Sequence, residues 1–350
     1  MKDKSGKMNL ALIARKCGLS KMTVSRALRR QTNVAPETRD QVMRIAEKMG
    51  FVPRSRKSAT TQTTTGHFYI LFKREYSIHD AYFSGIILTI QRELFDRGHG
   101  CSFGTINDDF SDFLKLSAML KSQDPAGVFV VGDILPRYAD TLLADFRHGI
   151  FIDFPGSPLI NRPYNSVSVD HVHGGHQGVS HLLGLNRRRI LLIVGRADHY
   201  FSRDLLQAYR ETLTENQIEF DPSLVLYGDH HVQSGYEVTK AALAAGLKFD
   251  AVFSNDEMAC GAMRAIQEAG RTVPAEISVL GFDGLPAGEL VTPRLSTVAI
   301  DREKMGRLAV RRLLALMQDE TEEPFEKTTL FPQLLIRESC GKNMSEKKEQ

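Results

Sequence analysis

The chain of 350 residues is too long for one ordinary core, so we expect two or three domains. Its hydrophobic content of 42% is typical of a globular protein, and the sequence has no apolar run near the roughly 20 residues that span a bilayer. The net charge of +3 hides an asymmetry: residues 1–60 carry 15 Lys and Arg against 4 Asp and Glu, and the rest carries 30 against 38. A polyanion is therefore expected to bind the N-terminal end.

The first predicted elements are three short helices. Apolar residues recur at helical spacing over residues 10–17, and Ser20 is suited to cap the next helix, over residues 21–29. A third helix begins at Pro36, which is favoured in a first turn. With about three residues between its first two helices, this segment predicts a helix-turn-helix DNA-binding domain over residues 1–52.

Residues 53–66 are polar and rich in Ser and Thr, and are predicted to be a linker. After it, short apolar runs alternate with longer helical stretches. Strands are predicted at residues 68–72, 101–106, 128–131, 150–153, 166–169, 190–194, 225–227, 251–254, 277–281 and 295–300. Helices are predicted at residues 84–97, 174–184, 205–216, 235–245, 259–269 and 304–317.

This alternation predicts an α/β domain whose parallel sheets are covered by helices on both faces. About ten strands are more than one open sheet usually holds, so we expect two lobes. Ligands bind such folds in the crevice at the carboxyl ends of the strands. The ligand-binding and dimerisation domain is predicted at residues 67–340. Its first lobe is predicted to contain residues 67–165 and 297–324, and its second lobe residues 166–296 and 325–340. A disordered tail is predicted at residues 341–350.

The second predicted helix carries side chains that can read DNA. Lys21, Met22 and Arg26 are its exposed, long side chains, and the N-terminal end of such a helix enters the major groove. Arg26 can bind a guanine through two hydrogen bonds, and Met22 can contact a thymine methyl group. Short hydroxyl side chains suited to phosphates are Ser20, Thr23 and Ser25. The alternatives are that Lys21 and Arg26 only solvate the helix surface, and that Ser20 only caps it.

The string CGLSKMTVSRALRR resembles the DNA-binding signature of the LacI/GalR, or lactose-repressor, family. Similar segments follow in order over roughly residues 9–340: NVAPETRDQVMRIAEKMGFVP, VFSNDEMACGAM, ISVLGFD and PRLSTVAIDREKMGRLA. The resemblance implies an all-α helix-turn-helix domain followed by a two-lobed, periplasmic-binding-protein-like effector domain. It also implies a dimeric transcription regulator, a repressor, that binds a near-palindromic double-stranded operator under the control of a sugar or sugar derivative. Asn33 joins the phosphate-contact candidates on the same basis.

The resemblance also implies three residues that face the effector in the cleft. Asp256 follows a predicted strand, at the turn where the family has a cleft aspartate; alternatively it stabilises a helix N-terminus. Asp153 ends another predicted strand and matches a second cleft position. Tyr82 lies where the family often has an aromatic residue, which can stack on a sugar face or pack in the core.

Arg203 is a fourth effector candidate. The family usually has a cleft arginine three residues before a Gly-aromatic pair, but the corresponding pair here is Ala208-Tyr209, which displaces Arg203 by two positions. Asp283 is expected to be structural, at a turn near the hinge between the lobes.

Other chemistries are less well supported. His171, His173 and His176 are metal-ligand types, but a solvated strand-to-helix loop is the favoured interpretation, as it is for His230-His231. The sequence has no GxGxxG, P-loop, GxSxG or HExxH motif, and its cysteines lack metal or redox spacing, so we expect no cofactor, no metal and no enzyme. A sugar-processing enzyme and a sugar sensor that does not bind DNA remain alternatives. The charged N-terminal segment lacks the apolar stretch of an export signal, so we expect a cytoplasmic protein without membrane partners.

Overall fold

The computed structural model describes residues 10–20, 23–24, 27, 38, 41–45, 66–74, 80–318 and 325–341. The chain divides into two compact units, Met1–Thr64 and Thr65–Gln350. The first unit begins with helix α1, Leu10–Cys17, which confirms the first predicted helix. Gly18 ends it with a φ of 64°, a conformation that glycine adopts without strain.

The described part of the first unit has a small apolar core. Ala14, Val24, Ala27 and Val42 are buried together. Residues 41–45 are helical, in agreement with the third predicted helix. The domain boundary at residue 52 and most of the predicted linker lie outside the described residues and stay predictions.

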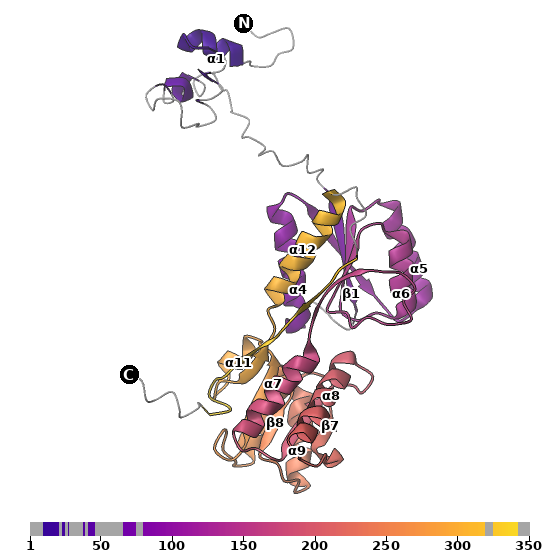
Figure 1. The fold of residues 1–350 in the computed structure, drawn as a ribbon, viewed down its shortest axis with the longest axis vertical. Coiled ribbons are helices and arrows are strands. Elements are labelled where there is room, and N and C mark those ends of the chain that lie inside the picture. Colours follow the sequence, from indigo (N-terminus) through magenta and orange to yellow (C-terminus); the bar gives the residue numbers. More distant parts are fainter. Residues whose placement is uncertain are drawn as a thin grey trace. The chain divides into compact units, whose positions relative to one another are not determined.

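The second unit contains two sheets (Figure 1). Strands of the first are β1 His67–Lys73, β2 Gly100–Ile106, β3 Gly127–Val131, β4 Gly149–Ile152, β5 Asn165–Val169 and β11 Lys327–Leu330. Strands of the second are β6 Ile190–Val194, β7 Val225–Tyr227, β8 Ala251–Phe253, β9 Ser278–Asp283, β10 Ser296–Ala299 and β12 Gln333–Leu335. Their orders are β11-β5-β4-β3-β1-β2 and β12-β10-β9-β8-β6-β7. All pairings are parallel except that of β10 with β12, which confirms the predicted parallel sheets.

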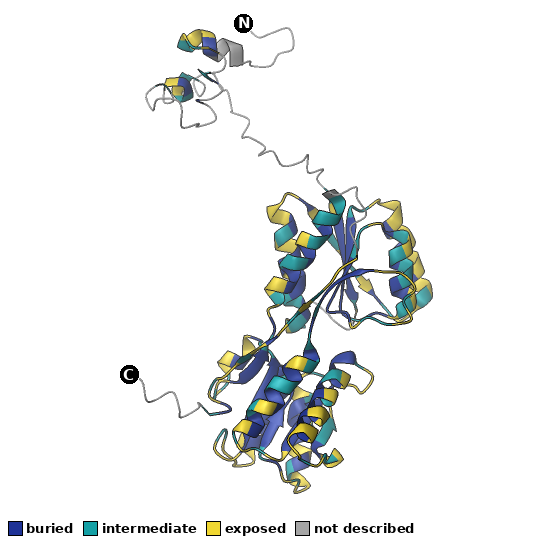
Figure 2. Ribbon diagram, viewed as in Figure 1, coloured by how far each residue is buried: buried dark blue, intermediate teal, exposed yellow. Residues whose placement is uncertain are grey.

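Helices cover both faces of each sheet, which gives the unit two lobes. The first lobe has α4 Ala81–Asp96, α5 Phe110–Ser122, α6 Pro136–Asp145 and α12 Arg302–Gln318. The second has α7 His171–Gly184, α8 Tyr200–Glu215, α9 Val232–Ala244, α10 Asp256–Glu268, the short α11 Ala287–Leu290 and a 3-10 turn at Pro222–Leu224. Figure 2 shows the strands buried at the centre of each lobe and the helices exposed on their outer sides.

The two-residue period of a strand explains how each sheet is covered. In β1, Phe68 and Ile70 pack with α4 and α12, while Tyr69 packs with α5 and α6 on the other face. In β6, Leu192 packs with α7 and α8, and Leu191 with α9 and α10. Strands buried on both faces are almost continuously apolar, which is why their positions were predictable from the sequence.

The boundaries between the lobes differ from the predicted ones. β5 pairs with β4, and β11 pairs with β5, so both belong to the first sheet, although the prediction gave them to the second lobe. β10 pairs with β9 in the second sheet, although residues 297–324 were predicted in the first lobe. The chain therefore crosses between the lobes after β5, after β10 and after β11. An apolar pattern reveals a strand but not its neighbour, so the sequence could not place these crossings.

Candidate functional site

The described part of the first unit shows how its second helix begins. Ser20 Oγ accepts a hydrogen bond from the backbone N–H of Thr23 at 3.0 Å and lies 2.8 Å from Thr23 Oγ1. The predicted capping role of Ser20 is confirmed, while contacts of Ser20 and Thr23 with phosphates stay predictions. The other DNA-contact candidates, Lys21, Met22, Ser25, Arg26 and Asn33, lie outside the described residues.

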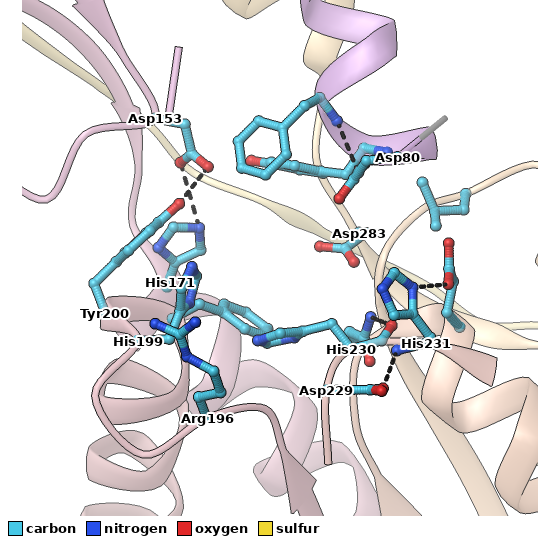
Figure 3. A pocket seen from close by; sticks show the side chains of 16 residues that line it. Asp80, Asp153, His171, Arg196, His199, Tyr200, Asp229, His230, His231 and Asp283 are labelled. Carbon is cyan, nitrogen blue, oxygen red and sulfur yellow. Dashed lines mark hydrogen bonds and ion pairs between the residues drawn. The ribbon is translucent and has the colours of Figure 1, made fainter. Parts of the chain in front are cut away.

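The second unit has a cavity of about 320 Å³ to which both lobes contribute, a volume that suits a small ligand (Figure 3). Its walls are formed mainly by turns and helix starts at the carboxyl ends of the strands, as expected for parallel sheets. The lining residues of the first lobe are Asp80, Tyr82, Phe83 and Asp153. Those of the second are His171, Arg196, His199, Tyr200, Phe201, Asp229, His230, His231, Asn255, Glu257, Asp283 and Leu285.

Asp153 follows β4 and joins the two lobes across the cavity. Its side chain is only 1% exposed, and Oδ2 accepts a 2.6 Å hydrogen bond from the hydroxyl of Tyr200, at the start of α8 in the second lobe. His171 Nε2 lies 3.7 Å from Oδ1 of the same carboxylate, and His171 Nδ1 lies 3.5 Å from Asp204. The predicted cleft position of Asp153 thus coincides with a polar bridge between the lobes.

His171 does not lie in the predicted solvated loop. It is the first residue of α7, which Asp170 caps by accepting a hydrogen bond from the His173 backbone N–H. The ring of His171 packs against Tyr200, Phe201 and Phe282, and His171 is only 5% exposed. His173 is exposed, and His176 contacts Thr212 and Glu211 on α8. The three histidines therefore do not converge, and the described ranges contain no group of three or more potential metal ligands.

His230, by contrast, lies in the predicted loop, but that loop forms part of the cavity wall. The imidazole ring of His230 contacts the ring of His199, with centroids 5.1 Å apart. Burial, with smaller effects from His199 and His231, lowers the pKa of His230 to about 4, and burial also lowers the pKa of His199. At neutral pH both rings are uncharged and offer flat faces and neutral polar edges to a ligand.

Asp283 ends β9 and also lines the cavity, so its position is not limited to the structural turn that we expected. Burial, and next the nearby Asp256, raise the pKa of Asp283 well above its ordinary value. Burial and the carboxylates of Asp153 and Asp283 raise the pKa of Tyr82 in the same way. The Tyr82 phenol, a predicted effector contact, therefore lies in an acidic part of the cavity.

Backbone strain is concentrated at this site. Among the described residues six that are not glycine have positive φ, and three of these line the cavity: Asp153 at 53°, His230 at 73° and Asp283 at 112°. Such conformations are costly for residues with a Cβ atom and occur often at ligand sites, where the surrounding structure holds them. The strain independently supports a binding role for this cavity.

Two predicted effector residues do not line the cavity. Asp256 lies behind its wall: Oδ1 accepts a hydrogen bond from Thr297 Oγ1 at 2.7 Å, and Oδ2 accepts one from the Leu285 backbone N–H at 2.6 Å. Arg203 is exposed on α8 and is absent from the lining, whereas Arg196, in the turn after β6, is part of it. Position after a strand, the rule that supported Asp153, would have identified Arg196 and Asp283 as well.

Two family descriptions match the sequence. Residues 9–54 match the bacterial regulatory proteins of the lacI family, and residues 179–340 match a periplasmic binding protein-like domain. The HTH-type transcriptional regulator CelR of Thermobifida fusca is 30% identical over 94% of this chain and 97% of its own length. The HTH-type transcriptional repressor MelR of Bacillus subtilis is 29% identical over 94% of this chain and 96% of its own length.

Solved structures agree with these relatives. A complex of the transcriptional regulator CelR with cellobiose has a TM-score of 0.69 and 28% identity, covering 95% of this chain and 100% of that one. A Lac repressor dimer bound to operator and the anti-inducer ONPF also has a TM-score of 0.69, with 26% identity, covering 96% and 99% of the two chains.

A helix-turn-helix domain followed by two parallel-sheet lobes around a cavity defines a ligand-responsive, DNA-binding transcription regulator. The chain belongs to the lacI family of bacterial regulatory proteins. Within the described residues no helix is both long and apolar enough to cross a membrane.

Proposed function

We propose that this regulator is a cytoplasmic, homodimeric repressor that binds a near-palindromic operator, and that a carbohydrate in the cavity between the lobes controls this binding. The observation that carries the proposal is the cavity itself, which combines carboxylates with flat rings. Asp153 and Asp283 can accept hydrogen bonds from hydroxyl groups, and Tyr82, Tyr200 and Phe201 can pack against the faces of a sugar ring. CelR, a relative that this chain matches over nearly its whole length, has been solved with cellobiose.

Hydrogen bonds connect the two lobes, and a ligand in the cavity can change the arrangement of the lobes that these bonds hold. Besides the bond from Tyr200 to Asp153, Arg302 donates hydrogen bonds to Ala81 O in the first lobe, at 3.4 Å, and to Gly284 O in the second, at 3.1 Å. A carbohydrate that binds one lobe arrangement more tightly shifts the population toward it. In a dimer such a shift changes the spacing of the two DNA-binding domains, and thereby operator affinity.

Exposed apolar residues support the dimer. Leu88 and Phe95 are 55% and 77% exposed on α4, and because they lie seven residues apart they share one face of the helix. A pair of bulky apolar side chains on one helical face is suited to an interface with a second copy. The Lac repressor to which this chain is similar has been solved as a dimer on its operator.

The test is a thermal-shift screen of the full-length protein against neutral mono- and disaccharides, because a ligand of the folded state raises its apparent stability. We expect at least one sugar to raise the Tm, and expect Asp153→Asn to remove that response. Asp112→Asn, on the exposed side of α5 and outside the cavity, is the matched control and should respond like the wild type. A stabilising sugar that the wild type hydrolyses or modifies would instead support the enzyme alternative.

A further inference from the structure

Charge is unevenly distributed over the cavity wall. Five carboxyl side chains line it, and the guanidinium of Arg196 is the one Lys or Arg group in the lining. Arg196 binds Asp198, which lies outside the lining, through Nε at 3.1 Å and through Nη2 at 3.2 Å. Since the nearby histidines His199 and His230 have lowered pKa values, acidic groups dominate the wall at neutral pH.

Three of the carboxyl groups gather around Tyr82, and we call Asp80, Asp153, Asp283 and Tyr82 the acidic corner. In Figure 3 Asp80 and Asp283 lie on the right of the view, away from Arg196, and Asp153 lies at the upper left beside Tyr200 and His171. They are close enough to act on one another: Asp80 and Asp153 both contribute to the raised pKa of Asp283. The carboxyl groups of the corner therefore oppose one another's ionisation, in addition to the effect of burial.

The arginine that acts on this corner does not balance its carboxyl groups. Arg302 acts on both Asp283 and Tyr82, but its guanidinium donates to the carbonyl groups of Ala81 and Gly284. With Arg302 in place the pKa of Asp283 still lies well above its ordinary value. A further positive charge in the corner would therefore be stabilised by the groups already present.

Asp153 independently indicates which kind of positively charged group a ligand would place in the acidic corner. Its side chain is buried and lines the cavity, and Oδ2 accepts the hydrogen bond from Tyr200. Oδ1 has His171 Nε2 at 3.7 Å, too far for a hydrogen bond, and accepts no hydrogen bond from any described residue. A buried carboxylate oxygen without a donor is costly, and a ligand that places an N–H group there removes that cost.

We propose that the effector carries a protonated amine, and that this amine binds in the acidic corner between the Tyr82 ring and Asp153 Oδ1. An ammonium group has three donors and no acceptor, which matches a corner of carboxylates, and it is attracted to the face of an aromatic ring. The inference rests on the proposed function, because it assigns the class of ligand that fills the same cavity. An amino sugar satisfies both proposals.

The experiment measures by calorimetry the binding of three matched sets of sugars to full-length protein at neutral pH. Each set contains a hexose, its 2-amino derivative and its N-acetylated 2-amino derivative, in the gluco, galacto and manno series. The N-acetyl compound keeps the nitrogen but removes the charge. We expect the amino sugar of at least one set to bind at least tenfold more tightly than both partners. A neutral hexose that binds as tightly as its amine in every responding set would overturn the inference and leave the carbohydrate proposal intact.

Cyclohexylamine and cyclohexanol at millimolar concentration separate the two proposals. Binding of the amine alone, with no response to any sugar, would support the acidic corner and contradict the carbohydrate effector. No preference for the amine in any set of sugars, together with no preference for cyclohexylamine over cyclohexanol, overturns the inference. Asp153→Asn and Asp283→Asn should each reduce the amine preference at least threefold, and Asp112→Asn, which removes one exposed charge outside the cavity, should retain it. If either cavity variant fails to fold, the comparison of amine and neutral ligands on the wild-type protein still tests the inference.

Discussion

Asp256 is a carboxyl group held almost without solvent at the start of α10. Its side chain is 1% exposed, and its two oxygens accept hydrogen bonds from Thr297 and from the Leu285 backbone. Burial raises the pKa of Asp256 to about 7, although both hydrogen bonds act in the opposite direction. Ionising this group in the folded protein is therefore more costly than ionising it in the unfolded chain.

The raised pKa predicts how stability depends on pH. The stability associated with Asp256 is fully present below the unfolded-state pKa near 4, and is lost as pH rises through about 7. Asp256→Asn, which keeps the shape and can donate to Thr297, should gain on the order of 2–3 kcal/mol over the wild type between pH 5 and pH 8. Urea unfolding at each pH measures the difference.

Asp145 is the control for this series. The hydrogen bond from Lys121 is the main cause that lowers its pKa, so its contribution is lost only below the ordinary range of an aspartate. The difference between Asp145→Asn and the wild type should stay constant from pH 5 to pH 8. A constant difference for Asp256→Asn as well would contradict the assigned burial of Asp256.

The sequence identified part of the site at the level of residues. Tyr82 and Asp153 line the cavity as predicted, because a residue that follows a buried strand or starts the next helix lies at the carboxyl edge of a sheet. Asp256 obeys the same rule but turns away, since Thr297, 41 residues later in the chain, captures its carboxylate. That partner comes from sheet pairing, which local sequence does not encode.

At the level of elements, the start of α8 acts as a bridge between the lobes. Tyr200 donates a hydrogen bond to Asp153 in the other lobe, whereas Tyr209, nine residues further along the same helix, donates one to Ile190 O at 2.8 Å within its own lobe. Both tyrosines are buried, and each hydroxyl group donates a hydrogen bond. The same helix therefore provides one tyrosine for a test variant and another for its control.

Tyr200→Phe should loosen lobe closure, and Tyr209→Phe should not. Each variant is expected to lose roughly 1–3 kcal/mol of stability, because each leaves a buried acceptor without its donor. Small-angle scattering of the ligand-free protein should show a larger radius of gyration for Tyr200→Phe alone. Equal radii for the two variants would show that the bond from Tyr200 to Asp153 does not hold the lobes together.

The sequence predicted the positions of strands and helices better than it predicted which strands pair with one another. The strands near residues 165 and 295 were predicted from their apolar runs, yet each was given to the wrong lobe, because sheet order depends on pairings between distant segments. β11 was not predicted, since its four residues KTTL contain no buried side chain. α5 and α6 were also not predicted, because each buries only three residues amid many polar ones.

At the level of the whole molecule, charge and cavity belong to different units. Residues 1–60 carry the excess of Lys and Arg, and residues after 66 form the cavity. Binding of DNA by the first unit should therefore weaken steeply with salt, as phosphate contacts do, whereas binding of an uncharged carbohydrate should not. Coupling between the two events is the property that makes the chain a regulator and not only a binding protein.

The most direct measurement is the fluorescence anisotropy of a labelled duplex, selected by the full-length protein from random DNA, against a shuffled duplex. We predict a near-palindromic selected site that is preferred at least 10³-fold, and a change in its affinity of about 5–150-fold when a cavity ligand is added. Arg26→Ala should reduce this preference by a factor that corresponds to about 1–3 kcal/mol. Equal binding of the selected and the shuffled duplex, with and without the ligand, would contradict the assignment of this chain as an operator-binding regulator.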